Sequence, residues 1–242
     1  MTYESPDPAR PEANADPEAQ APRRGFGCAL EILETLVLTL LIYLLIHNFV
    51  AQPFEVEQTS MVPTIVNGQY VLIDKISPHF SDYQRGDIVV FDPPDGYSEG
   101  GVPFIKRVIG LPGDTVSLEN GHVFVTPPGG SAVRLEEPYV ATDVSGAQEP
   151  SLPRNPDGTS SWTVPAGTFF VMGDHRSVSQ DSRVFGPIER DLIIGRAILR
   201  YFPLDRVGIF TRPDYPGLPS SNPTPSASAS PGALAPRLAP VG

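Results

Sequence analysis

The sequence has little sulfur and little positive charge. Its 242 residues include one cysteine, Cys28, and only two lysines, Lys75 and Lys106. A single cysteine excludes a disulfide within the chain, and no group of Cys and His has zinc-ligand spacing, so we predict no metal and no cofactor. The formal net charge is −11. Because neutralising phosphates requires clustered Lys and Arg, we also predict no nucleic-acid partner.

Proline and glycine are abundant, at 29 and 22 residues, beside 40% hydrophobic residues. This composition can form a core but places many residues in turns, which disfavours a helical bundle. Residues 1–27 are rich in Pro, Ala, Glu and Asp without apolar periodicity, and residues 212–242 are rich in Pro, Gly, Ser and Ala. We predict that both segments are disordered tails.

Residues 28–51 form an apolar run, CALEILETLVLTLLIYLLIHNFVA, with no charge after Glu34. As a helix, such a run reaches roughly 36 Å, enough to cross a hydrocarbon core of about 30 Å. One alternative is a buried helix of a soluble domain, but such helices are rarely apolar all round. Another is a cleaved signal peptide, which bulky Phe49, three residues before a cut after Ala51, opposes. We therefore predict a transmembrane helix that stays as an anchor.

Basic residues are distributed unevenly around this run. Arg10, Arg23 and Arg24 precede it, and no Lys or Arg follows until Lys75. The positive-inside rule then places the N-terminal tail in the cytoplasm and everything after residue 51 outside. The sequence predicts a single-pass protein of the plasma membrane, with the lipid bilayer as a partner.

Residues 52–211 contain short β-like runs between turn signals. The runs are YVLIDKI, DIVVFD, FIKRVIG, TVSLE, HVFVT, SWTVP, TFFVMG and LIIGRAILRYF. Such spacing is typical of an antiparallel or mixed β domain. The stretch from about residue 140 to 161 has no periodicity and is predicted to be a loop or an insertion. The predicted fold is mainly β, with one N-terminal transmembrane helix.

Two adjacent cations, Lys106 and Arg107, lie within an apolar run that is predicted to be a strand. Because side chains alternate along a half-buried strand, one of the two faces an apolar environment. A lysine there loses its charge, since desolvation lowers its pKa, whereas arginine cannot deprotonate. A neutral amine beside a serine such as Ser60 can activate it without histidine. On these residues alone, a snorkelling lysine and a surface serine remain the alternative.

A third segment, GDHRSVSQDSR at residues 173–183, concentrates glycine, small hydroxyl residues and paired charges. Such density is typical of a loop that builds a site. A hydroxyl in this loop can hold an amine, while Asp–Arg pairing fixes the shape of the loop.

Together these segments resemble the bacterial type I signal peptidases. The resemblance covers roughly residues 30–205 and depends on four blocks in the order of the family. The blocks are SMVPT at 60–64, GDIVVF at 86–91, KRVIGLPGD at 106–114 and GDHRSVSQDSR at 173–183.

The resemblance implies a catalytic role for Ser60 as nucleophile and for Lys106 as general base. Ser179 matches the hydroxyl that orients the lysine amine, and Asp181 and Arg183 match a supporting ion pair.

The sequence departs from the family at two positions. His175 stands where the family usually has Asn, and Gln58 stands where some members have a serine whose hydroxyl helps to bind the oxyanion. The backbone N–H of Ser60 is an expected oxyanion donor. The second donor is either the Gln58 amide or Thr59 with backbone groups.

The function implied is that of a membrane-anchored serine endopeptidase that removes N-terminal signal peptides from exported preproteins. The substrate would extend beside the strand that leads to Ser60. Shallow pockets would accept small side chains one and three residues before the cut, as in an A-x-A exit.

Three other functions are weighed against this one. A Ser-His-Asp hydrolase would use His79, His122 or His175, but no G-x-S-x-G motif occurs. A membrane-tethered module that binds peptides without cutting them is opposed by the presence of both Ser60 and Lys106. A cytoplasmic, DNA-linked Ser–Lys autoprotease of the repressor-cleaving type is disfavoured by the predicted anchor and the acidic charge.

Overall fold

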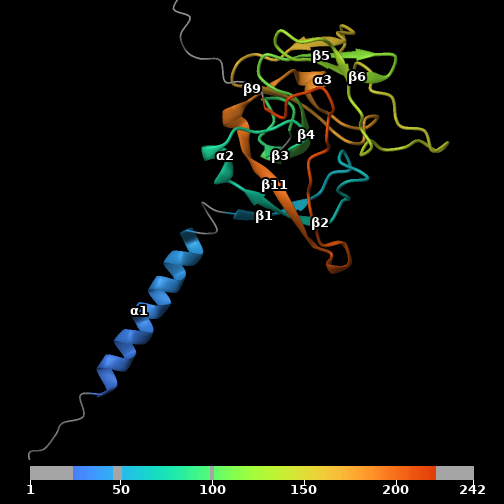
Figure 1. The fold of residues 1–242 in the computed structure, drawn as a ribbon. Helices are drawn as coiled ribbons and strands as arrows, with labels where there is room; N and C mark the ends of the chain where they lie inside the picture. Colours follow the sequence, from blue (N-terminus) through green and yellow to red (C-terminus); the bar gives the residue numbers. More distant parts are fainter. Residues whose placement is uncertain (1–23, 46–50, 99–100, 222–242) are drawn as a thin grey trace, which may run out of the picture. The chain divides into compact units, whose positions relative to one another are not determined.

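The computed structural model describes residues 24–45, 51–98 and 101–221 (Figure 1). The chain divides into two compact units, Met1–Leu44 and Leu45–Gly242. The described element of the first unit is helix α1 (Arg24–Leu45), and the described strands belong to the second.

Helix α1 has 22 residues and begins four residues before the predicted span, so residues 24–27 of the predicted N-terminal tail are helical. Its large apolar side chains between Leu30 and Tyr43 are exposed. Among the residues that the structure describes, no helix has both the length and the apolarity needed to cross a membrane. Residues 46–50 of the predicted span lie outside the described residues, and Ala51 is the first residue of a strand.

The second unit contains two antiparallel sheets (Figure 1). The larger sheet has the order β1-β2-β11-β3-β4-β9-β10, with β12 paired to β11. Its strands are β1 (Ala51–Val56), β2 (Gln69–Asp74), β3 (Ile88–Phe91), β4 (Phe104–Gly110), β9 (Thr168–Met172), β10 (Ile188–Glu189), β11 (Ile193–Phe202) and β12 (Gly208–Ile209). The smaller sheet has the order β7-β6-β5-β8, and its strands are β5 (Thr115–Glu119), β6 (His122–Thr126), β7 (Val133–Arg134) and β8 (Ser161–Thr163).

Short helical elements connect these strands. They are α2 (Ser77–Phe80), α3 (Ser182–Phe185) and the 3-10 turns η3 (Arg190–Leu192) and η4 (Leu204–Arg206).

The mainly β, antiparallel architecture agrees with the sequence prediction. Strands β4, β5 and β6 cover the same residues as the predicted runs FIKRVIG, TVSLE and HVFVT. Strands β7, β10 and β12 have two residues each, too few to show an alternating pattern. Strand β1 contains Pro53, which is tolerated because β1 lies at the end of the sheet.

Strand β4 is buried along its whole length, which corrects the half-buried strand expected from the sequence. It lies between β3 and β9 in the sheet, and apolar clusters that include Phe104, Ile105 and Ile109 pack around it. Lys106 and Arg107 are consequently both buried, with exposed fractions of 1% and 2%.

The folded region extends beyond residue 211, where the sequence predicted a disordered tail to follow. Tyr215 is buried in a core cluster, and Arg212 pairs with Asp87. The backbone N–H of Arg85 donates to the carbonyl of Ser220 at 3.0 Å. Because the segment is rich in proline, its composition did not indicate that Tyr215 is buried in the core. Residues 222–242 of the predicted tail lie outside the described residues.

Candidate active site

Ser60 lies in a tight turn that follows strand β1. The N–H of Ile65 donates to the carbonyl of Met61 at 2.9 Å, and the N–H of Gly68 donates to that of Val56 at 2.7 Å. Met61 and Ile65 are buried in the core, so apolar packing fixes the turn. Ser60 itself is 7% exposed. The turn thus holds a serine at the edge of the core.

Lys106 reaches this serine from strand β4. In the sheet it pairs with Val89 of β3, which fixes its backbone position. Its Nζ donates to Oγ of Ser60 at 2.7 Å and to the carbonyl of Ile105 at 2.9 Å. The Nζ atom also lies 4.9 Å from the centre of the Phe104 ring. The fold therefore brings together the serine and the lysine that the sequence analysis singled out.

Burial lowers the pKa of Lys106 from 10.5 to about 8, although the negative charges of Asp181 and Asp174 act in the opposite direction. Within the described residues, no carboxylate forms an ion pair with its amine. A substantial fraction of the amine is therefore neutral at mildly alkaline pH.

Arg107 has a different environment. Its Nε and Nη2 donate to the two carboxylate oxygens of Asp174 at 2.9 and 2.7 Å. The hydroxyl of Thr64 donates to the same carboxylate at 2.5 Å. Burial alone would lower the pKa of Arg107, but Asp174 raises it above its ordinary value. This network joins the Ser60 turn, strand β4 and the loop of residues 173–183.

Ser179 is completely buried in that loop. Its hydroxyl contributes to the lowered pKa of Asp181 but forms no hydrogen bond of acceptable geometry within the described residues. A Cβ at Gly173 would collide with the Ser179 side chain and with the carbonyl oxygen of Ser60. Glycine at this position therefore lets the two serine segments approach each other.

Asp181 and Arg183 form a buried, two-point ion pair. Nη2 and Nε of Arg183 each lie 2.8 Å from a carboxylate oxygen of Asp181. The same carboxylate accepts the N–H of Gly173 at 3.0 Å. Burial raises the pKa of Asp181, but Arg183 and these hydrogen bonds bring it below its ordinary value. The pair stays charged and shapes the loop around Ser179.

The hydrogen bond that the structure gives the Gln58 side chain is with Pro103, and that of the Ser60 hydroxyl is with Lys106. Nε2 of Gln58 donates to the carbonyl of Pro103 at 3.4 Å, which is long for a hydrogen bond. The residue lines a cavity of about 310 Å³ together with Val56, Val102 and Ile105. Within the described part of the chain, the backbone N–H of Ser60 has no hydrogen-bond acceptor.

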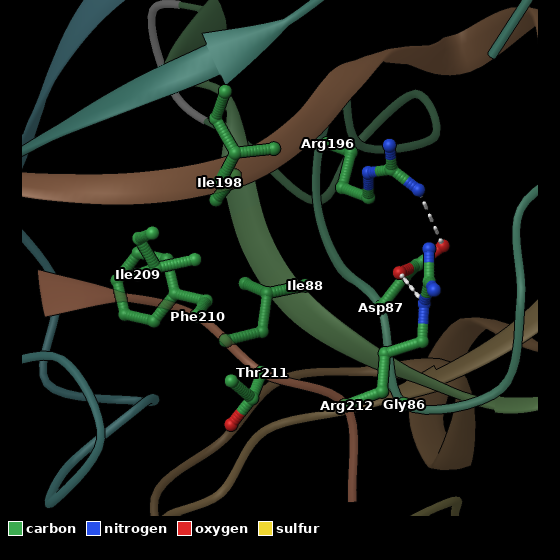
Figure 2. A pocket seen from close by; sticks show the side chains of 10 residues that line it. Gly86, Asp87, Ile88, Arg196, Ile198, Ile209, Phe210, Thr211 and Arg212 are labelled. Atoms are coloured by element: carbon green, nitrogen blue, oxygen red, sulfur yellow. Dashed lines mark hydrogen bonds and ion pairs between the residues drawn. The ribbon is translucent and has the colours of Figure 1, made fainter. Parts of the chain in front are cut away.

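A second cavity, of about 330 Å³, contains neither Ser60 nor Lys106 (Figure 2). Arg196 and Arg212 line it, and both pair with the carboxylate of Asp87. Ile88 and Phe210 form apolar parts of its wall. Its lining carries two arginines and one carboxylate, and both arginines engage that carboxylate.

The three histidines in the described part of this unit do not form a Ser-His-Asp site. His79 lies in α2, and His122 is exposed on β6. His175 lies beside Ser60, but its ring contacts the carbonyl of Thr59 and the carboxylate of Glu149. The hydrogen-bond partner that the structure gives the Ser60 hydroxyl is Lys106.

Sequence analysis missed the roles of Thr64, Asp174 and Glu149. Thr64 and Asp174 lie inside the SMVPT and GDHRS segments, so their presence there was a usable signal. Glu149 lies in the stretch without periodicity, and no pattern in the sequence indicates its contact with His175.

Residues 29–202 match the family model described as "Signal peptidase, peptidase S26". The chain belongs to this family. It is similar to "Signal peptidase I" of Leptolyngbya laminosa, with 35% identity over 86% of this chain and 96% of the relative. It is also similar to "Probable signal peptidase I-1" of a Synechocystis species, with 39% identity over 74% of this chain and 85% of the relative.

A crystal structure of a signal peptidase I from Enterococcus faecalis V583 is 32% identical, with a TM-score of 0.36, and the match covers 48% of this chain and 97% of that one. Membership in the signal peptidase family assigns the chain to the peptidase hydrolases and supports the removal of signal peptides as its reaction.

Proposed function

We propose that the chain removes N-terminal signal peptides from exported preproteins as a membrane-anchored endopeptidase, with Ser60 as nucleophile and Lys106 as general base. The observation that carries this proposal is the 2.7 Å contact between Nζ of Lys106 and Oγ of Ser60. The contact is buried, and burial lowers the pKa of the amine to about 8. A buried, partly neutral amine in contact with a hydroxyl can accept its proton, which activates the hydroxyl as a nucleophile.

In the first step, the neutral amine of Lys106 accepts the hydroxyl proton of Ser60 while Oγ attacks the scissile carbonyl carbon. Negative charge develops on the carbonyl oxygen, and the unpartnered N–H of Ser60 is available to stabilise it. The second donor is a backbone group or the amide of Gln58.

In the second step, the ammonium of Lys106 gives its proton to the leaving amine nitrogen as the carbon–nitrogen bond breaks. An ester on Oγ of Ser60 remains. Lys106 then takes a proton from water, the resulting hydroxide attacks the ester, and the proton returns to Ser60 as the acid leaves. The Ser179 hydroxyl forms no hydrogen bond in the described residues, and its proposed role is to turn toward the amine and orient it during this cycle. The Asp181–Arg183 pair holds the loop that carries Ser179.

Substrate binding is supported by the position of β1. In the described sheet β1 pairs with β2 on one side, so its other edge can receive an extended peptide as an additional strand. Side chains two residues apart in an extended peptide point to the same side. The apolar cavity that Val56, Val102 and Ile105 line suits the small side chains one and three residues before the cut.

Membrane anchoring is supported by the apolar sequence of residues 28–51 and by the arginines that precede it. The proposed orientation places the N-terminus in the cytoplasm and the β unit outside. Protease added to right-side-out vesicles should then degrade the β unit and spare residues 1–27. Protection of the β unit would reverse the orientation.

The decisive experiment incubates the purified full chain with a preprotein that carries an A-x-A exit. Wild type should cut after the last alanine, and Ser60→Ala and Lys106→Ala should each lose nearly all activity. The double variant should be barely slower than either single one, because the two residues act as a unit. Tight peptide binding without cleavage by the wild type would instead favour a peptide-binding module.

A further inference from the structure

His175 contacts two consecutive residues of the nucleophile turn. Its backbone N–H donates to the carbonyl of Ser60 at 3.0 Å, and its Nδ1 lies 3.2 Å from the carbonyl oxygen of Thr59. On the other side of the ring, Nε2 lies 3.2 Å from Oε1 of Glu149. The ring is partly buried, with 26% of the side chain exposed.

The ring lies between two hydrogen-bond acceptors. The Thr59 carbonyl can only accept, and an ionised Glu149 can only accept. Burial raises the pKa of Glu149, but hydrogen bonds from Ser177 and the charge of His175 lower it below its ordinary value, which keeps it ionised. When both of its nitrogens carry a proton, the ring donates through Nδ1 to Thr59 and through Nε2 to Glu149, and the two acceptors hold its orientation.

Glu149 belongs to a strap, residues 137–154, that lies along the loop of residues 173–183. Its carboxylate accepts the N–H and the hydroxyl of Ser177 at 2.9 and 2.7 Å. The carbonyl of Leu152 accepts from Arg183 at 3.3 Å, and Arg154 donates to the carbonyl of Ser177. The strap thus fixes the position of Glu149.

The other charged groups near His175 are already engaged. Asp174, which precedes it, is held by Arg107. Arg176, which follows it, pairs with Glu137 of the strap at 2.6 Å. Glu149 is therefore the charged group that the His175 ring contacts directly.

The contact with Thr59 bears on the reaction because of peptide geometry. The carbonyl of Thr59 and the N–H of Ser60 belong to one planar peptide group and point in opposite directions when the bond is trans. Holding the carbonyl oxygen toward His175 therefore sets the direction of the Ser60 N–H. That N–H is the expected oxyanion donor.

We propose that His175, held by Glu149, is a positioning residue that orients the Thr59–Ser60 peptide so that its N–H points at the developing oxyanion. The inference depends on the proposed function of Ser60. The donor acts mainly in the transition state, so the pair should contribute to kcat and leave KM nearly unchanged.

The test measures kcat and KM for preprotein cleavage by the full chain. His175→Ala should lower kcat by about tenfold, less than the hundredfold or more that follows complete loss of an oxyanion donor. His175→Asn places an amide N–H near the position of Nδ1 and should recover kcat to within about threefold of wild type. The matched controls are His122→Ala and Glu136→Gln, two exposed residues outside the site, which should leave kcat unchanged.

Coupling between the two residues separates positioning from general destabilisation. Glu149→Gln should lower kcat about threefold in the wild type, and it should have no further effect in the His175→Asn background, because asparagine is too short to reach residue 149. If His175→Ala fails to fold, this cycle in the His175→Asn background still decides.

The proposal is overturned if His175→Ala and Glu149→Gln match wild-type kcat, if only KM changes, or if the two effects are independent. These outcomes are distinct from failure of the proposed function. The proposed function fails if the wild type does not cut the preprotein or if Ser60→Ala retains activity, and the inference about His175 then fails as well.

Discussion

Two neighbouring cations on strand β4 have opposite environments. Arg107 meets the Asp174 carboxylate at two points, and this partner raises its pKa. Lys106 is equally buried but has no carboxylate at ion-pair distance within the described residues, and burial lowers its pKa to about 8. The same strand and the same burial thus give one permanent charge and one base.

The difference follows from the chemistry of the two side chains. A guanidinium cannot lose its proton in a protein, so its burial requires a paired carboxylate. An amine can avoid the cost of a buried charge by releasing its proton. Arg107 therefore links segments of the structure, and Lys106 is available for proton transfer.

The largest effect is expected when the difference between the two cations is removed. Lys106→Arg should abolish nearly all cleavage, as Lys106→Ala should, because a guanidinium does not accept the proton of Ser60.

The pH dependence of the wild type tests the same amine. A general base must be deprotonated to act, so kcat/KM should rise with pH through about 8. A profile of kcat/KM from mildly acidic to alkaline pH checks this. A flat profile would contradict a titrating amine.

Breaking the buried Arg107–Asp174 pair should lower stability more than breaking an exposed pair. Asp174→Asn leaves a buried guanidinium without its counter-charge and should cost about 3 to 5 kcal/mol of unfolding free energy. Urea denaturation of the β unit in the full chain measures this. As a control, the exposed pair of Arg190 and Asp82, 3.3 Å apart, should show less than about 1 kcal/mol on Asp82→Asn. Equal losses would mean that burial of the pair is unimportant.

Lys106→Met should have the opposite sign, because it removes a buried amine. Below pH 8 the amine is protonated in both states and the folded state bears the full cost of burying its charge, so the variant should be more stable by on the order of 1 to 3 kcal/mol. Between about pH 8 and 10.5 the unfolded wild type binds more protons than the folded one, so wild-type stability rises with pH and the gain shrinks. Denaturation curves at pH 7 and pH 10 test this. A loss of stability at pH 7 would show that packing around the amine outweighs its desolvation.

The sequence predicted the segments that carry the candidate catalytic residues better than the contacts that hold those segments in place. Strand β4 and the Ser60 turn could be predicted from the sequence, because apolar runs and turn residues are local signals. Burial on both faces of β4 could not be predicted, because it depends on core clusters whose members come from distant positions in the chain. The contact between Glu149 and His175 spans two loops without periodicity, and only the fold brings them together.

The smallest effect is expected at Gln58, which lies outside the pair of cations on β4 and tests the second oxyanion donor. Its amide is directed to the carbonyl of Pro103 and it lines the cavity proposed for substrate side chains, which favours a backbone group as the proposed second oxyanion donor. Gln58→Ala should then change kcat by only a few-fold, less than the hundredfold or more expected for loss of a true oxyanion donor. Gln58→Ser, which introduces a hydroxyl at this position, should equal or improve on wild type. Steady-state kinetics of both variants, with unfolding curves to confirm their fold, measure this. A drop in kcat of two orders of magnitude for Gln58→Ala would make the Gln58 amide the second donor, because in that case the side chain must turn from Pro103 toward the oxyanion when substrate binds.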